Sequence, residues 1–163
     1  MGREVTVVMR HALGAPVVVA LLLAGGCRNI DVVTASYATL AEARAAGAVG
    51  AGRIPEGLPP GTHDLREARD LDTARRWTLF SFPPAEREAL MALLEPEEVS
   101  LEGENCDVPG RIEWWPVLLR NRLNAAQISA TGLRSYKGRN SDLVYAVNWS
   151  QGRAYAWTLD RRR

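Results

Sequence analysis

The pattern of apolar and polar positions divides the chain into a short apolar run near the N-terminus and a longer segment of mixed strand and helix signals. The run 16–23 is entirely apolar, but it is shorter than the roughly 20 residues that cross a bilayer. It follows Arg10 and precedes small residues, which is the order of a cleavable secretory signal. We therefore predict a signal peptide over residues 1–26 and a single domain over residues 27–163.

The first half of the predicted domain has the pattern of a helix followed by a hairpin. Thr39 and Glu42 have the spacing of a capping box, in which the two side chains accept hydrogen bonds from free amides, so we expect a helix over 40–46. Strand-like residues on both sides of an Asp-Thr-Ala turn predict a β-hairpin over 62–82.

Between that helix and that hairpin lies a segment dense in glycine and proline, residues 47–61. Its glycines are not followed by the Gly-Lys-Ser/Thr of a phosphate loop, and their order differs from that of a dinucleotide fingerprint. We expect an irregular loop that folds over the sheet, with Ile54 and Leu58 as its apolar contacts.

The second half alternates helical and strand-like signals. Leucines on one face predict an amphipathic helix over 85–94, and a similar pattern predicts a helix over 115–123. Two β-rich runs, 143–149 and 154–159, are joined by a turn that contains glycine, and 127–136 is expected to add a third strand.

In the C-terminal hairpin we expect each large residue to lie opposite a small one. The predicted pairs are Trp149 with Ala154, Val147 with Ala156, and Ala146 with Trp157. Such complementarity indicates that both faces of the sheet are covered. The predicted fold class is α+β: a small antiparallel sheet, made of the central hairpin plus a C-terminal meander, packed against two or three short helices.

Charge excludes one class of partner. The whole chain has 20 basic and 19 acidic residues, and removal of the leader takes away Arg3, Arg10 and Glu4, which leaves 18 of each. Because phosphate backbones are bound by clustered positive charge, a neutral domain is not expected to bind nucleic acid.

The end of the leader resembles the cleavage site of bacterial lipoproteins. Leu23, Ala24, two glycines and Cys27 resemble the family's order of Leu, two small residues and Cys, although one extra small residue puts Ala24 where Leu usually stands. The resemblance implies lipidation of Cys27 and attachment to a membrane through that anchor. It also implies a place in the bacterial cell envelope, and Arg28 after the cysteine implies the periplasmic face of the outer membrane in a bacterium with two membranes.

Ordinary secretion is the alternative. Ala24 and Gly26 also fit the small-x-small rule of the general signal peptidase, and cleavage after Gly26 would leave the thiol of Cys27 unmodified. A disulfide between Cys27 and Cys106, the only two cysteines, would then be possible in an oxidising compartment. The lipid and the disulfide exclude each other.

A second resemblance covers residues 52–82, which read GRIPEGLPPGTHDLREARDLDTARRWTLFSF. The segment resembles a group of bacterial lipoproteins that share a G-x-I-P-x-x-L-P run, an acidic-Leu-Asp-Thr turn and a W-x-x-F-x-F strand. The matching residues are Gly52, Ile54, Pro55, Leu58, Pro59, Asp70, Asp72, Thr73, Trp77, Phe80 and Phe82. These relatives have no assigned reaction, so the resemblance implies fold and envelope location without an activity.

Few residues could carry chemistry. His63 is the only histidine after the leader, which excludes a metal site built from several histidines. The acidic run 95–107 lacks the ligand spacing of a Ca²⁺ loop and is expected to be a solvated loop. One nucleophile pair, Cys106 with His63, is possible on residue type alone. We predict no cofactor, no metal and no catalytic residue.

The other polar and aromatic candidates have structural explanations. Asp70 and Asp72 flank the predicted hairpin turn, where carboxylates usually cap backbone amides. Trp114 and Trp115 are expected to lie in the core.

These observations predict an envelope-anchored lipoprotein that acts without catalysis, by binding another envelope protein or as an accessory factor. The alternatives are a secreted domain with the Cys27–Cys106 disulfide, and a thiol enzyme that uses Cys106 and His63.

Overall fold

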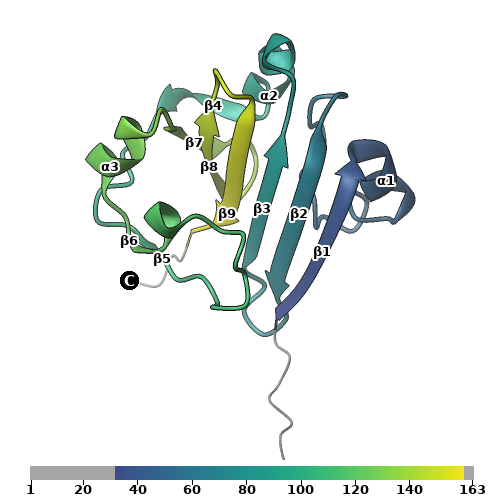
Figure 1. Ribbon diagram of the computed structural model, residues 1–163, viewed down its shortest axis with the longest axis horizontal. Coiled ribbons are helices and arrows are strands. Elements are labelled where there is room, and N and C mark those ends of the chain that lie inside the picture. The colour runs from purple at the N-terminus through teal and green to yellow at the C-terminus, as the bar shows by residue number, and fades with distance from the viewer. Residues whose placement is uncertain (1–31, 160–163) are drawn as a thin grey trace, which may run out of the picture.

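The computed structural model describes residues 32–159 and contains one seven-stranded antiparallel sheet (Figure 1). Its strands, in spatial order, are β1 (Val32–Thr39), β2 (His63–Asp70), β3 (Arg76–Ser81), β9 (Arg153–Thr158), β8 (Leu143–Asn148), β7 (Arg134–Gly138) and β4 (Leu94–Glu98). The short elements are α1 (Leu40–Ala45), α2 (Arg87–Met91), α3 (Ala125–Ala130), the 3₁₀ turns Pro84–Glu86 and Val117–Leu119, and the ribbon of β5 (Asn105–Cys106) and β6 (Asn121–Arg122).

The predicted class, α+β with an antiparallel sheet, is confirmed, but the sheet is larger than expected. The central hairpin and the C-terminal strands join directly, because β3 pairs with β9 through Trp77 and Trp157. Strand β1 extends the sheet beyond the hairpin, and β4 extends it at the opposite edge.

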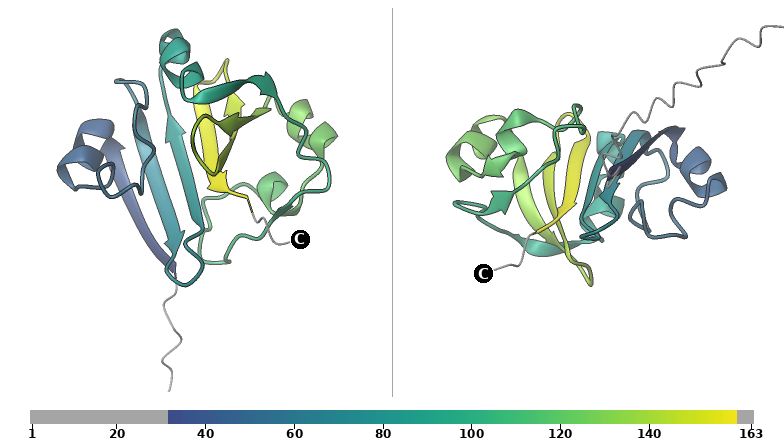
Figure 2. Two further views of the ribbon diagram at one scale, coloured as in Figure 1. Left: turned by 180° about the vertical axis from the view of Figure 1, so that it is seen from behind. Right: turned by 90° about the horizontal axis from the view of Figure 1, so that it is seen from below.

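Both faces of the sheet carry a buried core, as the pairing of large and small residues predicted. We call the face that bears Leu65, Phe80 and Tyr145 the first face; α1, the glycine-rich loop and α2 contribute to its core. The second face bears Trp77 and Trp157, and residues 99–133 cover it. Figure 2 shows these two coverings on opposite sides of the strands.

Strand β8 shows how the sequence encodes a sheet that is covered on both sides. All six of its residues are buried. Tyr145 and Val147 belong to the core of the first face, whereas Val144 and Ala146 belong to that of the second. A strand with two buried faces reads as a continuous apolar run instead of an alternation.

The predicted register of the C-terminal hairpin is wrong by two residues. Val147 pairs with Ala154, not Ala156, because Asn148 ends β8 and caps the turn. The Oδ1 atom of Asn148 accepts hydrogen bonds from the Ser150 hydroxyl and the Gln151 amide. A shift of two leaves every side chain on its predicted face, since side chains alternate with a period of two.

Two predictions for the second half are wrong over part of their length. The expected helix over 115–123 is only the 3₁₀ turn Val117–Leu119, because the Trp115 indole donates to the Leu119 carbonyl at 2.8 Å and occupies it. The expected third strand over 127–136 is confirmed only at its end, where β7 begins at Arg134 and pairs with β8, whereas residues 127–130 belong to α3, whose first turn is capped by the Asn124 side chain.

The solvated loop expected over the acidic run 95–107 is only partly confirmed. Its first residues form β4, the edge strand of the sheet, in which only Leu94 is buried. An edge strand can carry exposed glutamates and a proline because these residues hinder pairing with another sheet. The predicted helix over 85–94 is shorter as well, since α2 ends at Met91.

The N-terminal elements agree with the sequence. Thr39 caps α1 by accepting a hydrogen bond from the Glu42 amide, and the Glu42 carboxylate accepts one from Ala38. The predicted signal peptide and Cys27 lie outside the described residues. Within residues 32–159 no helix is long and apolar enough to cross a membrane.

Candidate functional site

The glycine-rich loop lies on the first face of the sheet. As expected, Ile54 and Leu58 are its apolar contacts, with exposures of 0 % and 3 %. The loop is held locally by the Ala48 carbonyl, which accepts hydrogen bonds from the amides of Arg53 and Ile54. These contacts place the Arg53 side chain over β2.

Beneath this loop lies a buried carboxylate that the sequence did not single out. The side chain of Glu67, at the middle of β2, is only 4 % exposed. It accepts a hydrogen bond of 3.0 Å from the Tyr37 hydroxyl and pairs with Arg53 at 3.2 Å. Arg53 also donates to the Ala46 carbonyl, so this cluster ties the loop to the two strands below it. Burial and then the hydrogen bond to Glu67 raise the pKa of Tyr37, so its hydroxyl keeps its proton.

Next to this cluster is a cavity of about 330 Å³ that three arginines line, Arg53, Arg69 and Arg76. Arg69 of β2 and Arg76 of β3 lie directly opposite each other in the register of the hairpin. The Arg76 guanidinium is fixed by two contacts of 2.7 Å, one to the Gly52 carbonyl and one to the Asp142 carboxylate. Among the described residues no ion pair or side-chain hydrogen bond is formed by Arg69.

A second cavity, of about 410 Å³, shares Gly52 and Arg76 with the first. Its other lining residues include Ile54, Leu143 and Tyr145 of the core and Arg139. Arg139 donates to the Leu94 carbonyl and is thereby held to β4. The contact between Arg76 and Gly52 therefore lies at the boundary of the two cavities.

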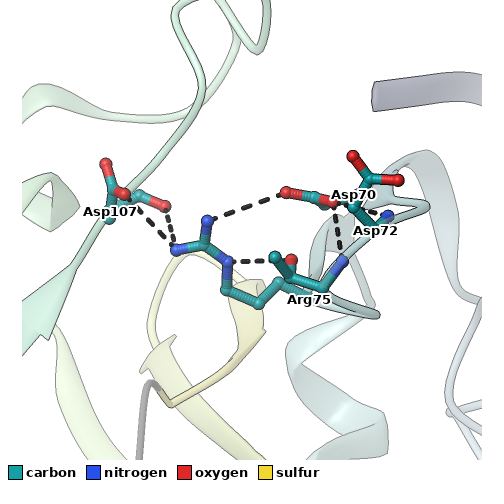
Figure 3. A network of polar contacts seen from close by, with 5 residues as sticks. Asp70, Asp72, Arg75 and Asp107 are labelled. Carbon is teal, nitrogen blue, oxygen red and sulfur yellow. Dashed lines mark hydrogen bonds and ion pairs between the residues drawn. The ribbon is translucent and has the colours of Figure 1, made fainter. Parts of the chain in front are cut away.

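The hairpin turn between β2 and β3 is a polar network, as expected for its aspartates (Figure 3). One oxygen of Asp70 accepts hydrogen bonds of 2.9 Å from the amides of both Asp72 and Thr73. Its other oxygen lies 3.7 Å from Arg75, which reaches Asp107 at 3.4 Å. The predicted capping role is confirmed for Asp70, and Arg75 connects the turn to the covering of the second face.

The electrostatics of Asp70 follow from these contacts. Burial alone would raise the pKa of this carboxyl, but hydrogen bonds from Thr73 and Asp72 and the charge of Arg75 together lower it below its ordinary value. Asp70 is therefore ionised and acts as a structural acceptor.

The structure does not bring Cys106 and His63 together. Cys106 is 3 % exposed in the core of the second face, and burial raises its pKa to about 12, which suppresses the nucleophilic thiolate. The adjacent Asp107 contacts Arg75 near the Asp70 end of β2, whereas His63 begins that strand. Seven residue steps along a strand span roughly 23 Å.

The remaining candidates have structural roles. Trp115 is buried, as predicted. Its ring packs edge-on against the rings of Tyr155 and Trp157, with ring centroids 5.6 and 5.7 Å apart. In the acidic run, Glu102 accepts a hydrogen bond from the Ala125 amide at the start of α3. Within residues 32–159 no group of three or more His, Cys, Asp or Glu is placed to hold a metal ion.

Sequence reasoning missed Glu67 and the three arginines, although one signal pointed to them. Leu65, Glu67 and Arg69 alternate along one strand and must share a face, and Leu65 marks that face as the buried one. Charged residues at inward positions need partners, which here come from the loop and from β1.

Residues 31–81 match the family described as the YbbD head domain. The matched segment contains β1, α1, the glycine-rich loop and the β2–β3 hairpin, and thus all three cavity arginines. No curated protein matches the chain. No solved structure matches it either.

Proposed function

We propose that the protein is an envelope-anchored lipoprotein whose domain acts as a non-enzymatic binding or accessory module. One observation supports this assignment more than any other: β1 begins at Val32, five residues after Cys27, which would be the first residue left by the predicted cleavage. Five residues extend at most about 18 Å, so a lipid on Cys27 would hold the start of the sheet close to the bilayer.

Such an anchor would also fix which end of the domain faces the membrane. Val32 pairs with Asp70, so the β2–β3 turn lies at the tethered end of the sheet. His63 pairs with Ser81, which pairs with Arg153, so the β8–β9 turn lies at the far end. In this orientation the far end would be the one presented to an envelope protein.

The buried positions of the polar residues are consistent with a non-enzymatic role. Asp70 caps a turn, Glu67 holds a loop, and the Cys106 thiol is buried and protonated. Each of these groups stabilises the fold through contacts within the domain.

The intact mass of the mature protein from its native host tests the anchor. We expect the mass of residues 27–163 plus a diacylglycerol group, incorporation of labelled palmitate, and loss of both in Cys27→Ala. The matched control, Cys106→Ala, should keep the label. An unmodified Cys27 would overturn the proposal, and the additional loss of two thiol hydrogens would identify the secreted disulfide form instead.

The orientation can be tested with a single fluorophore on lipidated protein in vesicles. Asp72 and Gln151 are exposed residues in the two opposite turns, so each can be replaced by cysteine and labelled. A quencher attached to lipid headgroups should quench the label of Asp72→Cys strongly and that of Gln151→Cys weakly. Equal quenching at both positions would contradict the proposed orientation.

A further inference from the structure

We propose that the arginine-lined cavity beneath the glycine-rich loop binds a phosphate group, with Arg69 as its principal ligand. The cavity is built by residues of the described domain and does not depend on the fate of Cys27.

The register places two like charges face to face. Arg69 and Arg76 are a direct cross-strand pair, and both line the same cavity. Like charges directly opposite each other in a sheet are destabilising. An anion bound between or above the two guanidinium groups would relieve this repulsion. Three carboxylates lie at or beside the cavity, and each already has an arginine partner: Glu67 pairs with Arg53, Asp142 with Arg76, and Asp70 with Arg75.

Two of the three arginines are held in place before any ligand arrives. Arg53 is fixed by Glu67 and the Ala46 carbonyl, and Arg76 by Asp142 and the Gly52 carbonyl. Arg69 is the cavity arginine that pairs with no carboxylate among the described residues, since Asp70, the third carboxylate at the cavity, pairs with Arg75. Preorganised donors bind more tightly because less conformational entropy is lost on binding.

The donor set suits phosphate. Guanidinium groups donate paired hydrogen bonds to phosphate oxygens, and a phosphate group has enough acceptor oxygens to serve more than one arginine. A cavity of about 330 Å³ leaves room for part of the molecule that carries the phosphate. Val33 pairs with Arg69, so the cavity lies near the end of the sheet where β1 begins, and the phosphate could belong to a soluble metabolite or to a lipid headgroup.

Calorimetric titration of the full chain with inorganic phosphate and with glycerol 3-phosphate, at constant ionic strength, tests the proposal. We expect saturable binding that Arg69→Gln weakens at least tenfold. Arg66→Gln is the matched control, since Arg66 is an exposed arginine of the same strand on the opposite face, and it should bind as the wild type does. Binding that is absent, or that falls equally in both variants, would overturn the proposal.

A gain of affinity provides a test that misfolding cannot imitate. In Asp142→Asn the Gly52 carbonyl still holds Arg76 in place, and the lost carboxylate no longer competes with phosphate for the guanidinium group, so this variant should bind phosphate several-fold more tightly. In phosphate-free buffer of low ionic strength, Arg69→Gln should also melt at a temperature equal to or above that of the wild type, because the repulsion is removed. A weaker affinity in Asp142→Asn would contradict the assignment.

Vesicles distinguish the two sources of the phosphate. If the ligand is a lipid headgroup, Arg69→Gln should bind phosphatidylglycerol vesicles more weakly than the wild type, and glycerol 3-phosphate should compete with them. If the ligand is soluble, glycerol 3-phosphate should bind, whereas phosphatidylglycerol and phosphatidylcholine vesicles should show no dependence on Arg69. Both results support a phosphate site, and failure of both ligands overturns it.

Discussion

Removal of the Glu67 carboxylate tests the role of the buried cluster beneath the glycine-rich loop. Glu67→Ala deletes the acceptor of the Tyr37 hydrogen bond and the partner of Arg53. Loss of the hydrogen bond costs about 1 kcal/mol. The Arg53 side chain is 22 % exposed and can turn toward water when its partner Glu67 is removed. Loss of this ion pair should therefore cost about 1 kcal/mol, less than the roughly 3 to 5 kcal/mol that breaking a fully buried ion pair costs.

The truncated side chain adds the cost of a small cavity, which brings the expected loss in free energy of unfolding to about 3 kcal/mol. For a domain of this size the melting temperature should then fall by roughly 10 °C. The conservative variant Glu67→Gln keeps an acceptor for Tyr37 and fills the space, so it should lose about 1 kcal/mol.

Urea unfolding and amide hydrogen exchange are the appropriate assays. Glu67→Ala should speed exchange in residues 46–61 more than in β8 and β9, because the cluster holds the loop onto the strands. Glu56→Ala is the matched control, since Glu56 is an exposed glutamate of the same loop. A loss of stability in Glu67→Ala no greater than that in Glu56→Ala, or loop exchange at the wild-type rate, would show that the cluster does not hold the loop on the strands.

Three other substitutions or treatments have defined outcomes. Asp70→Ala should cost about 1 to 2 kcal/mol at pH 7, and because the pKa of Asp70 is lowered by folding, urea titrations should show this difference shrink as the pH falls below about 4. Cys106, with its raised pKa of about 12, should be alkylated at pH 8 roughly 100-fold or more slowly in native than in unfolded protein, as followed by peptide mass spectrometry; equal rates would refute its burial. Gly152→Ala should cost more than about 2 kcal/mol, because the glycine has a φ of +60° and the added Cβ would meet the Phe82 carbonyl, whereas Gly110→Ala, with open space around it, should change thermal stability by less than about 0.5 kcal/mol.

Local signals in the sequence were sufficient for the elements whose stabilising contacts are close along the chain. The capping box of α1 joins Thr39 and Glu42, and the turn of the central hairpin is capped by Asp70 from within four residues. The loop between them was recognisable from its glycines and prolines, and its contacts Ile54 and Leu58 from being its isolated apolar residues. The family match over residues 31–81 covers this same part of the chain.

Where distant contacts decide the conformation, the local pattern was misleading. Trp115 binds the Leu119 carbonyl with its indole and packs on Trp157, which prevents the helix that the leucines suggested. Strand β4 was read as a loop because its outward residues are acidic, and only its pairing with β7 makes it a strand. The packing of Trp115 on Trp157 and the pairing of β4 with β7 join residues far apart in sequence, so no local window contains them.

The sequence by itself determined the class of the domain, its antiparallel hairpins, the faces of the C-terminal hairpin, and the position of Cys27 behind an apolar run. Only the tertiary structure decided the order of the strands, the burial of Cys106 away from His63, and the meeting of Arg53, Arg69 and Arg76. The physical reason is that periodicity and capping are short-range, whereas a charged cavity is created by strand pairing and by a loop that folds back over the sheet.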